Sequence, residues 1–293
     1  MSTESLRANK LFDLSGWVTL VTGGGTGIGL MCAQALAANN AKVYIAAREM
    51  EDLENAAKKW STDSKGSGHL IPVHVDITDK SSIEKLYKEI SSKEEQLHLL
   101  VNNAGIAGPT RSVEKGAEGA EALGQELMKD SFDDWKDVYA TNVIGYHFMS
   151  AAFLPLLGKA TEKNYGFSSS IINISSISGQ LKISQHHMPY NASKAAAIQL
   201  TEMFAVHCSD AGVKVRVNTI APGVFPSGMT TDGVDEDQKS RIDADGYREK
   251  KGIPAGRPGK EEDMAIAVLA CATNQYMNGQ TVTVDGGYML KNP

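Results

Sequence analysis

The sequence predicts an α/β fold, a doubly wound parallel sheet with helices on both faces. Short apolar runs alternate with helical patterns along almost the whole chain, as expected when helices connect the parallel strands of one sheet. The strand-like runs are apolar at consecutive positions, which is typical of a sheet that is covered on both sides. Because we find no internal repeat and no linker, we expect a single domain over residues 11–290.

The first half of the chain alternates expected strands with short helices. The first strand ends in a run of glycines, and the others are apolar runs rich in β-branched residues. One helix places Ile83, Leu86 and Ile90 on one side, which is the spacing of a buried helical face. In chain order we expect strand 17–21, helix 31–38, strand 42–46, helix 49–60, strand 70–75, helix 80–92 and strand 97–101.

The second half continues the alternation with longer helices. The first of these is nearly all apolar in its second half, and a run of small and apolar residues after Tyr190 predicts another. In chain order we expect helix 131–157, strand 170–174, the helix that contains Tyr190, strand 214–220, helix 260–273 and strand 281–284.

Two long segments interrupt this rhythm. Residues 107–129 are rich in Gly, Ala and Glu, and residues 222–258 carry prolines and many charges. Each directly follows a strand, so each is expected at the carboxyl ends of the strands, where ligands bind in such sheets. We expect residues 222–258 to form a substrate lid. For both segments a plain surface loop remains an alternative.

Composition and charge exclude several classes of protein. Of the 293 residues, 42% are hydrophobic and 22% are charged, which is ordinary for a soluble globular protein. The net charge is −6 and Lys and Arg do not cluster, so we expect no nucleic-acid partner. No run approaches the roughly 18 apolar residues of a membrane span, so we expect no membrane partner. Cys32, Cys208 and Cys271 match no metal spacing, so we expect buried thiols, no metal and a cytoplasmic location.

Tyr190 and Lys194 are candidates for acid–base chemistry. Residues four apart on a helix lie on one face, so the phenol and the ammonium can act at one place. A tyrosine has a pKa of about 10, and a nearby positive charge stabilises its phenolate and lowers that pKa. A chance pair on a solvated helix is the alternative, and the remaining motifs weigh against it.

The first strand ends in a glycine-rich turn, Thr22-Gly23-Gly24-Gly25-Thr26-Gly27-Ile28-Gly29. Glycine permits a tight turn and a close approach of the backbone to an anion, and the following helix offers free N–H groups and the positive end of its dipole. No Gly-Lys-Ser/Thr follows, which disfavours a P-loop nucleotidase. At the first strand-to-helix turn, this motif predicts a cradle for the phosphates of a dinucleotide.

The end of the second strand indicates which dinucleotide binds. An acidic residue there would bind the adenosine ribose of NAD, whereas an Arg suits the 2′-phosphate of NADP. Ala47 and Arg48 occupy this position, which favours NADP(H) over NAD(H). The alternative is that Arg48 pairs with a neighbouring carboxylate of Glu49, Glu51 or Asp52. Asp76, after the third strand, could accept a hydrogen bond from the adenine amino group, with Ile77 beside it.

Together these residues resemble the motifs of the short-chain dehydrogenase/reductase family, in its branch of smaller oxidoreductases. The resemblance runs from about residue 11 to residue 288 and implies a Rossmann-type fold. The matching motifs are Thr22-Gly23-x3-Gly27-x-Gly29, Asn102-Asn103-Ala104-Gly105, Asn142, Ser176, Tyr190-x3-Lys194, Pro222-Gly223 and Val284-Asp285-Gly286-Gly287.

The resemblance implies a role for each matched residue. Asn142, Ser176, Tyr190 and Lys194 are expected to be catalytic. The residues expected to bind the cofactor are Gly23, Gly25, Thr26, Gly27, Ile28, Gly29, Arg48, Asp76, Ile77, Asn103, Ala104, Gly105, Tyr190, Lys194, Pro222, Gly223, Val224 and Ser227.

The chain departs from the family pattern in three places. Ser176 precedes Tyr190 by 14 positions, one more than is usual, so Ser175 is a less favoured alternative. Ser227 stands where the family often has a Thr that contacts the nicotinamide amide. The segment 107–129 is also longer than usual. His186 and His187 precede Tyr190, and a place in the pocket wall and a place on the surface both stay open.

The resemblance implies an NADP(H)-dependent carbonyl reductase that transfers hydride between NADPH and a small to medium ketone of ketoacyl or polyketide type. Ser176 would hold the carbonyl oxygen, Tyr190 would protonate it, Lys194 would lower the pKa of Tyr190 and hold the nicotinamide ribose, and Asn142 would position a water. Alternatives are an NAD(P)-dependent alcohol or polyol dehydrogenase and a non-catalytic dinucleotide sensor. The family commonly forms homodimers and homotetramers through the long helix and the Tyr190 helix.

Overall fold

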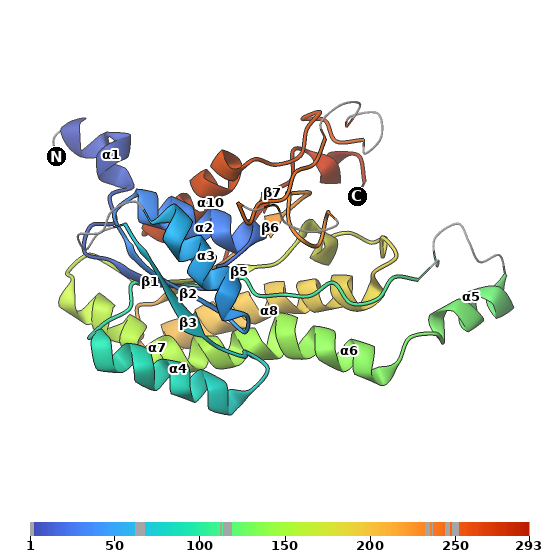
Figure 1. The fold of residues 1–293 in the computed structure, drawn as a ribbon, viewed down its shortest axis with the longest axis horizontal. Helices are drawn as coiled ribbons and strands as arrows, with labels where there is room; N and C mark the ends of the chain where they lie inside the picture. The colour runs from blue at the N-terminus through green and yellow to red at the C-terminus, as the bar shows by residue number, and fades with distance from the viewer. Residues whose placement is uncertain are drawn as a thin grey trace.

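The centre of the protein is one seven-stranded sheet in the order β3-β2-β1-β4-β5-β6-β7 (Figure 1). The computed structural model describes residues 3–61, 68–111, 113, 119–231, 235, 237–243, 247 and 252–292. All neighbouring strands are parallel, which confirms the fold class. The strands are β1 Val18–Thr22, β2 Lys42–Ala47, β3 Leu70–His74, β4 Leu99–Asn102, β5 Ser170–Ile174, β6 Arg216–Pro222 and β7 Thr281–Val284.

The order of the strands reverses between β1 and β4. The chain moves outward from β1 through β2 to β3, then returns to the other side of β1 with Val21 opposite Val101. Parallel strands separate at their carboxyl ends at such a point and leave a crevice between the following loops. The glycine turn after β1 and the Asn103 motif after β4 therefore lie next to each other.

Helices cover both faces of the sheet, and each face has its own apolar core (Figure 1). The β-branched and apolar strand residues alternate between the two cores, so both cores draw on the same strands. One face carries α2 Gly27–Ala38, α3 Met50–Trp60 and α10 Glu261–Thr273. The other carries α4 Lys80–Lys93, α7 Gly145–Lys163 and α8 Met188–Asp210.

The expected helix over 131–157 consists of three helical segments that follow one another without a break. A capping box of Ser131 and Asp134 starts α6 Phe132–Tyr139, the π-helical turn η2 Ala140–Ile144 follows, and α7 continues to Lys163. A π-turn inserts one extra residue into the helical ladder and is frequent at functional sites. Here it holds Asn142, which is fully buried.

The segment 107–129 is not a loop throughout, which corrects the expectation. It contains α5 Ala120–Leu127, which extends away from the body of the molecule (Figure 1) and buries none of its side chains. Ala, Glu, Leu and Gln are strong helix formers, and they outweigh the two glycines nearby. Residues 112 and 114–118 lie outside the described residues, as do 232–234, 236, 244–246 and 248–251 of the expected lid.

Short helical turns complete the described chain. They are η1 Thr3–Leu6 and α1 Ala8–Leu11 at the N-terminus, η3 Ile177–Gly179 after β5, and η4 Tyr288–Leu290 after β7. In the part of the chain that the structure describes, no helix has the length and apolar character needed to cross a membrane. Cys32, Cys208 and Cys271 are buried and unpaired, as expected.

Candidate active site

A cavity of about 850 Å³ opens at the carboxyl ends of β1 to β5. It lies where the strand order reverses, as expected for a ligand site in a doubly wound sheet. The sequence-predicted site residues that line it are Gly23, Thr26, Gly27, Ile28, Arg48, Asp76, Ile77, Asn103, Ala104, Gly105, Tyr190, Lys194 and Ser227.

The glycine turn brings the backbone close to this cavity. Gly23 and Gly27 have φ of 63° and 52°, a backbone shape that favours glycine. Asn103 braces the turn from β4 by donating to the carbonyl oxygens of Thr22 and Gly23 at 3.0 and 3.2 Å. A Cβ on Gly29 would lie 2.0 Å from the Gly23 carbonyl oxygen, so the tight start of α2 requires glycine there.

Five predicted cofactor residues do not line the cavity. Gly29 lies behind the turn, and Gly25 packs against Asp52 and Leu53 of α3. The remaining three lie at the carboxyl end of β6. The Gly223 N–H donates to the Val284 carbonyl oxygen at 2.9 Å, and Val224 lines a separate small cavity of about 110 Å³. Those three are Pro222, Gly223 and Val224.

Arg48 lies exposed at the far end of the cavity. Its charge contributes to a lowered pKa of Asp76, whose main cause is the hydrogen bond from the Thr78 hydroxyl at 2.6 Å. Glu49 and Asp52 line the same end of the cavity. No ion pair between Arg48 and either carboxylate is found among the described residues, so the guanidinium is available to an anion.

Tyr190 and Lys194 project from α8 toward the carboxyl end of β5. The Lys194 Nζ donates to the Ile174 carbonyl oxygen at 2.9 Å and lies 5.6 Å from the centre of the Tyr190 ring. It also lies 5.5 Å from the ring centre of Tyr146 on α7. Lys194 is only 3% exposed, and a Cβ on Gly105 would approach its Nζ to 3.4 Å. The phenol and the ammonium therefore share one buried corner of the cavity.

Ser176 lies beside Tyr190, whereas Ser175 has another partner. The Ser176 side chain lies close enough to the Tyr190 phenol to influence its pKa. The Ser175 hydroxyl instead donates to the Lys194 carbonyl oxygen at 2.7 Å, which fixes α8 to the end of β5. The one-residue difference in spacing thus leaves Ser176, not Ser175, next to the phenol.

The pKa values of Tyr190 and Lys194 differ from what the sequence predicts. Burial raises the pKa of Tyr190, and the Ser176 side chain opposes that rise. Burial lowers the pKa of Lys194 to about 7, so near neutral pH its charge is only partly present. The expectation that Lys194 lowers the pKa of Tyr190 is therefore wrong for this structure: burial raises that pKa, and the opposing influence comes from Ser176 and not from Lys194.

Asn142 acts as a brace between two elements. Its Oδ1 accepts from the Ile106 N–H at 2.9 Å, and its Nδ2 donates to the Ile106 carbonyl oxygen at 2.9 Å and to the Ser193 hydroxyl at 3.0 Å. These bonds hold the chain that follows β4 against α8 at Ser193, one residue before Lys194. The side-chain amide is thereby occupied by protein groups.

Ser227 lies directly over the glycine turn. A Cβ on Gly27 would lie 3.0 Å from the Ser227 Cβ, and the Thr230 hydroxyl accepts from the Ser227 N–H at 2.9 Å. The start of the 222–258 segment therefore covers the end of the cavity at the glycine turn.

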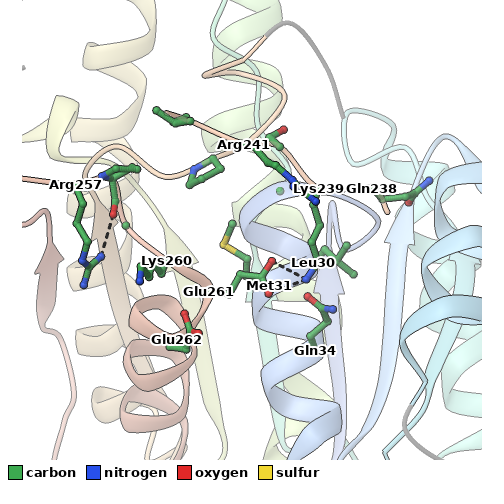
Figure 2. Close-up of a pocket in the computed structure, with 16 residues that line it drawn as sticks. Leu30, Met31, Gln34, Gln238, Lys239, Arg241, Arg257, Lys260, Glu261 and Glu262 are labelled. Carbon is green, nitrogen blue, oxygen red and sulfur yellow. Dashed lines mark hydrogen bonds and ion pairs between the residues drawn. The ribbon is translucent and has the colours of Figure 1, made fainter. Parts of the chain in front are cut away.

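A second cavity of about 570 Å³, lined in part by Pro226, lies between α2 and α10 (Figure 2). Leu30 and Met31 form part of its wall, and Lys239 crosses it to pair with Glu261 at 2.7 Å. None of the four candidate catalytic residues lines it.

Sequence reasoning missed several residues of the main cavity. Thr78 fixes Asp76, and its position two residues later is a common turn signal. Asp137 and Thr141 line the cavity on the helix that leads to Asn142, and nothing in their local pattern marks them. The other additional lining residues are Ala46, Ala47, Glu49, Asp52, Val75, Ile106, Ala140, Ile174, Ser175, Gly228 and Met229.

Comparison with known proteins agrees with this arrangement. The family profile described as short chain dehydrogenase matches residues 17–238. The chain belongs to the short-chain dehydrogenase/reductase family. The short-chain dehydrogenase/reductase PhomF of Diaporthe leptostromiformis is 36% identical over 99% of this chain and 97% of that protein. The rhamnolipids biosynthesis 3-oxoacyl-[acyl-carrier-protein] reductase of Pseudomonas aeruginosa is 32% identical over 95% and 98%.

A solved structure of this family has the same fold. The Pseudomonas aeruginosa RhlG/NADP active-site complex superposes with a TM-score of 0.76 at 30% identity, over 95% of this chain and 98% of that chain. This short-chain dehydrogenase/reductase therefore shares its fold with a protein whose solved structure is described as a complex with NADP.

Proposed function

We propose that the protein is an NADP(H)-dependent carbonyl reductase that acts on a small to medium ketone of ketoacyl or polyketide type. The observation that carries the proposal is the meeting of Tyr190 and Lys194 in a cavity that also holds the glycine turn and Arg48, with the buried Ser176 beside Tyr190 just outside the cavity lining. A proton donor and a cradle for a dinucleotide thus share one space.

The residues of the turn fit a dinucleotide phosphate. Gly23 and Gly27 leave no side chain between the backbone and the cavity, and α2 begins at Gly27 with its N–H groups directed there. Bound NADPH supplies a hydride to the carbonyl carbon of the substrate. Arg48 would hold the 2′-phosphate, Asp76 the adenine, and Lys194 the nicotinamide ribose.

Ser176 and Tyr190 provide the other half of the reaction. The Ser176 hydroxyl holds the carbonyl oxygen, and the Tyr190 phenol donates its proton to that oxygen as negative charge develops there. A raised pKa keeps Tyr190 protonated at neutral pH, so the phenol carries the proton that the reaction needs, although it is a weaker acid than free tyrosine. Asn142 holds the chain after β4 against α8 and thereby keeps Lys194 in place. Proton delivery to Tyr190 would then depend on Lys194 and on solvent near it.

The relatives support the class of substrate. The names of the similar proteins include 3-oxoacyl-[acyl-carrier-protein] reductases, whose substrates are ketones. The segment 222–258 covers the phosphate end through Ser227, and we propose that it closes over substrate and cofactor. We also propose a homodimer or homotetramer through α7 and α8, where Met203 and Val206 are about half exposed.

Replacing Tyr190 by Phe tests the chemistry. We expect Tyr190→Phe to bind NADPH normally and to lose turnover by at least about a hundredfold, because a preplaced donor is worth that much in the transition state. Ketones, ketoacyl thioesters and sugars would be screened with the parent to find a substrate. Tyr165→Phe, at a fully exposed phenol, is the control. Normal turnover by Tyr190→Phe would exclude this mechanism.

Replacing Arg48 by Ala tests the choice of cofactor. We expect NADPH binding, followed by fluorescence titration, to weaken by about tenfold to a hundredfold, which is the range for a hydrogen bond to a charged group. NADH binding should stay unchanged. Arg7→Ala, on the exposed N-terminal turn, serves as the control. Tighter binding of NADH than NADPH by the parent would favour the NAD-dependent alcohol dehydrogenase instead, with Glu49 and Asp52 near the ribose.

A further inference from the structure

A chain of hydrogen bonds leads from Ser176, the neighbour of Tyr190, away from the cavity to Tyr288. The Ser176 side chain influences the pKa of Tyr190, and the Ser178 N–H donates to the Ser176 Oγ at 3.1 Å. The Ser178 hydroxyl donates to the Gln185 Oε1 at 2.9 Å. The Gln185 Nε2 in turn donates to the Tyr288 hydroxyl at 3.0 Å. Gln185 is therefore the link between the catalytic corner and the C-terminal turn η4.

The first part of this chain gives the Ser176 hydroxyl a direction. A serine hydroxyl has one proton to donate and rotates to suit its partners. Because the Ser178 N–H occupies an acceptor position on the Ser176 Oγ, the proton of Ser176 is left for Tyr190 or a substrate oxygen. Any movement of Ser178 would change this orientation.

The loop that carries Gln185 is strained and is held from outside. Gln185 and His186 have φ of 51° and 67°, a conformation that costs an L-residue other than glycine roughly 1–2 kcal/mol. Such a backbone persists only where its surroundings enforce it. The Arg111 N–H donates to the His186 carbonyl oxygen at 2.8 Å, and the His186 Nδ1 lies 2.9 Å from the Arg111 carbonyl oxygen. This loop is part of the stretch between Ser176 and Tyr190 that is one residue longer than usual.

The C-terminal partner is itself fixed in place. Asp285 accepts from the N–H groups of Gly287 and Met289 at 2.8 and 2.9 Å, which forms the turn that presents Tyr288. Gly286 and Gly287 have φ of 62° and 85°, so this turn requires the two glycines. These bonds make η4 a rigid anchor for Gln185.

A second tie joins the same loop to the C-terminal segment. The Thr283 hydroxyl on β7 donates to the Gln180 Oε1 at 3.0 Å. The loop after Ser176 is therefore fastened at two points to one rigid segment.

We propose that Gln185 is a positioning residue that, anchored by Tyr288, sets the orientation of Ser176 beside Tyr190. This inference rests on the proposed reductase function. Gln185 itself touches neither the substrate carbonyl nor the reacting atoms in the mechanism proposed above, so its effect passes through Ser178 and Ser176.

Three variants test the proposal. Gln185→Asn keeps an amide and tolerates a left-handed backbone, but is one methylene too short to reach both partners. Gln185→Glu can accept from both the Ser178 and the Tyr288 hydroxyls. Tyr288→Phe removes only the distant anchor. Gln125→Asn, on the exposed helix α5, is the matched control.

We expect Gln185→Asn to lower kcat by about tenfold, the worth of a hydrogen bond of about 1.4 kcal/mol, while the KM for NADPH and the melting temperature stay near the parent values. Gln185→Glu should have a kcat close to that of the parent, and Tyr288→Phe should lower kcat by less than Gln185→Asn does. Hydrogen exchange over residues 177–187 should be faster in Gln185→Asn and Tyr288→Phe than in the parent and the control.

The outcomes separate the two proposals. A parent protein that reduces no ketone with NADPH refutes the proposed function. Unchanged exchange over 177–187 in both Gln185→Asn and Tyr288→Phe overturns the link itself, whatever the activity. If the parent is active, the positioning role is overturned when Gln185→Asn has the same kcat as the parent. It is also overturned when kcat falls only together with the melting temperature and the affinity for the cofactor.

Discussion

Replacing Lys194 by Met is expected to make the folded protein more stable at pH 7 while abolishing its turnover. Lys194 is 3% exposed, and burial lowers its pKa from 10.5 to about 7. A buried ammonium has lost its hydration, and one carbonyl oxygen, that of Ile174, accepts its hydrogen bond at 2.9 Å. The position is thus retained for chemistry and not for stability.

The magnitude follows from the pKa change. Each unit is worth about 1.4 kcal/mol, so the shift of Lys194 destabilises the folded state by about 4 kcal/mol at pH 7. Removing the side chain also removes its hydrogen bond to Ile174, which contributes about 1 kcal/mol. Methionine is unbranched and fills a similar apolar volume. We therefore expect Lys194→Met to raise the free energy of unfolding by about 2–3 kcal/mol at pH 7, allowing for imperfect packing.

The direction in which the free energy of unfolding changes with pH tests whether the lowered pKa of Lys194 is the cause of the difference. Between pH 7 and 10.5 the unfolded state binds more protons at Lys194 than the folded state does, so the parent becomes more stable as the pH rises through this window. The gap between Lys194→Met and the parent should therefore narrow from pH 7 to pH 9.5 in urea unfolding followed by tryptophan fluorescence. Lys88→Met, at an exposed lysine of α4, should show no such gap. A Lys194→Met protein that is less stable than the parent at pH 7 would refute the reasoning.

Three further predictions concern stability and the turn. His98 accepts from the Val18 N–H at 3.0 Å, and burial lowers its pKa from 6.5 to about 4. When the pH falls from 7 to 5, the free energy of unfolding of the parent should decrease by about 2 kcal/mol more than that of His98→Asn, because His98 takes up a proton in the unfolded state but not in the folded state. Arg216 donates to the carbonyl oxygens of Cys271 and Ala272 in the last turn of α10 and to that of Met277 beyond it. Arg216→Met should therefore lower the free energy of unfolding in urea by at least about 3 kcal/mol, because these acceptors lose their donor. Gly29→Ala should weaken NADPH binding and lower the melting temperature together, because its Cβ would meet the Gly23 carbonyl oxygen at 2.0 Å.

The alternation of strands and helices could be predicted because its physical cause is local. A strand covered on both faces needs apolar residues at consecutive positions, and a surface helix needs them on one side. The π-turn at Asn142 could not be predicted, because one extra residue in a helical ladder leaves no mark in the apolar pattern. The helix α5 was missed for a different reason: it is only eight residues long and lies in a segment rich in Gly, so the helical spacing of Ala120, Leu123 and Leu127 did not stand out.

Within the candidate site, the sequence predicted which residues lie together more reliably than it predicted their pKa values. Tyr190 and Lys194 share a corner because helical spacing alone places them on one face. Their pKa values depend on burial by α7 and β5, which no local pattern reveals. Gln185 was not singled out at all, because its partner Tyr288 is 103 positions away along the chain.

The extra residue between Ser176 and Tyr190 is tolerated because the loop does not set the distance between them. Ser175 and Lys194 join β5 to α8 directly: the Ser175 hydroxyl donates to the Lys194 carbonyl oxygen at 2.7 Å, and the Lys194 Nζ donates to the Ile174 carbonyl oxygen at 2.9 Å. These two bonds fix the strand end and the helix at positions flanking the catalytic pair. The loop can then absorb an inserted residue as local strain at Gln185, provided that outside contacts hold it in place. Chain spacing is therefore a weaker guide to the catalytic serine than the element that carries it.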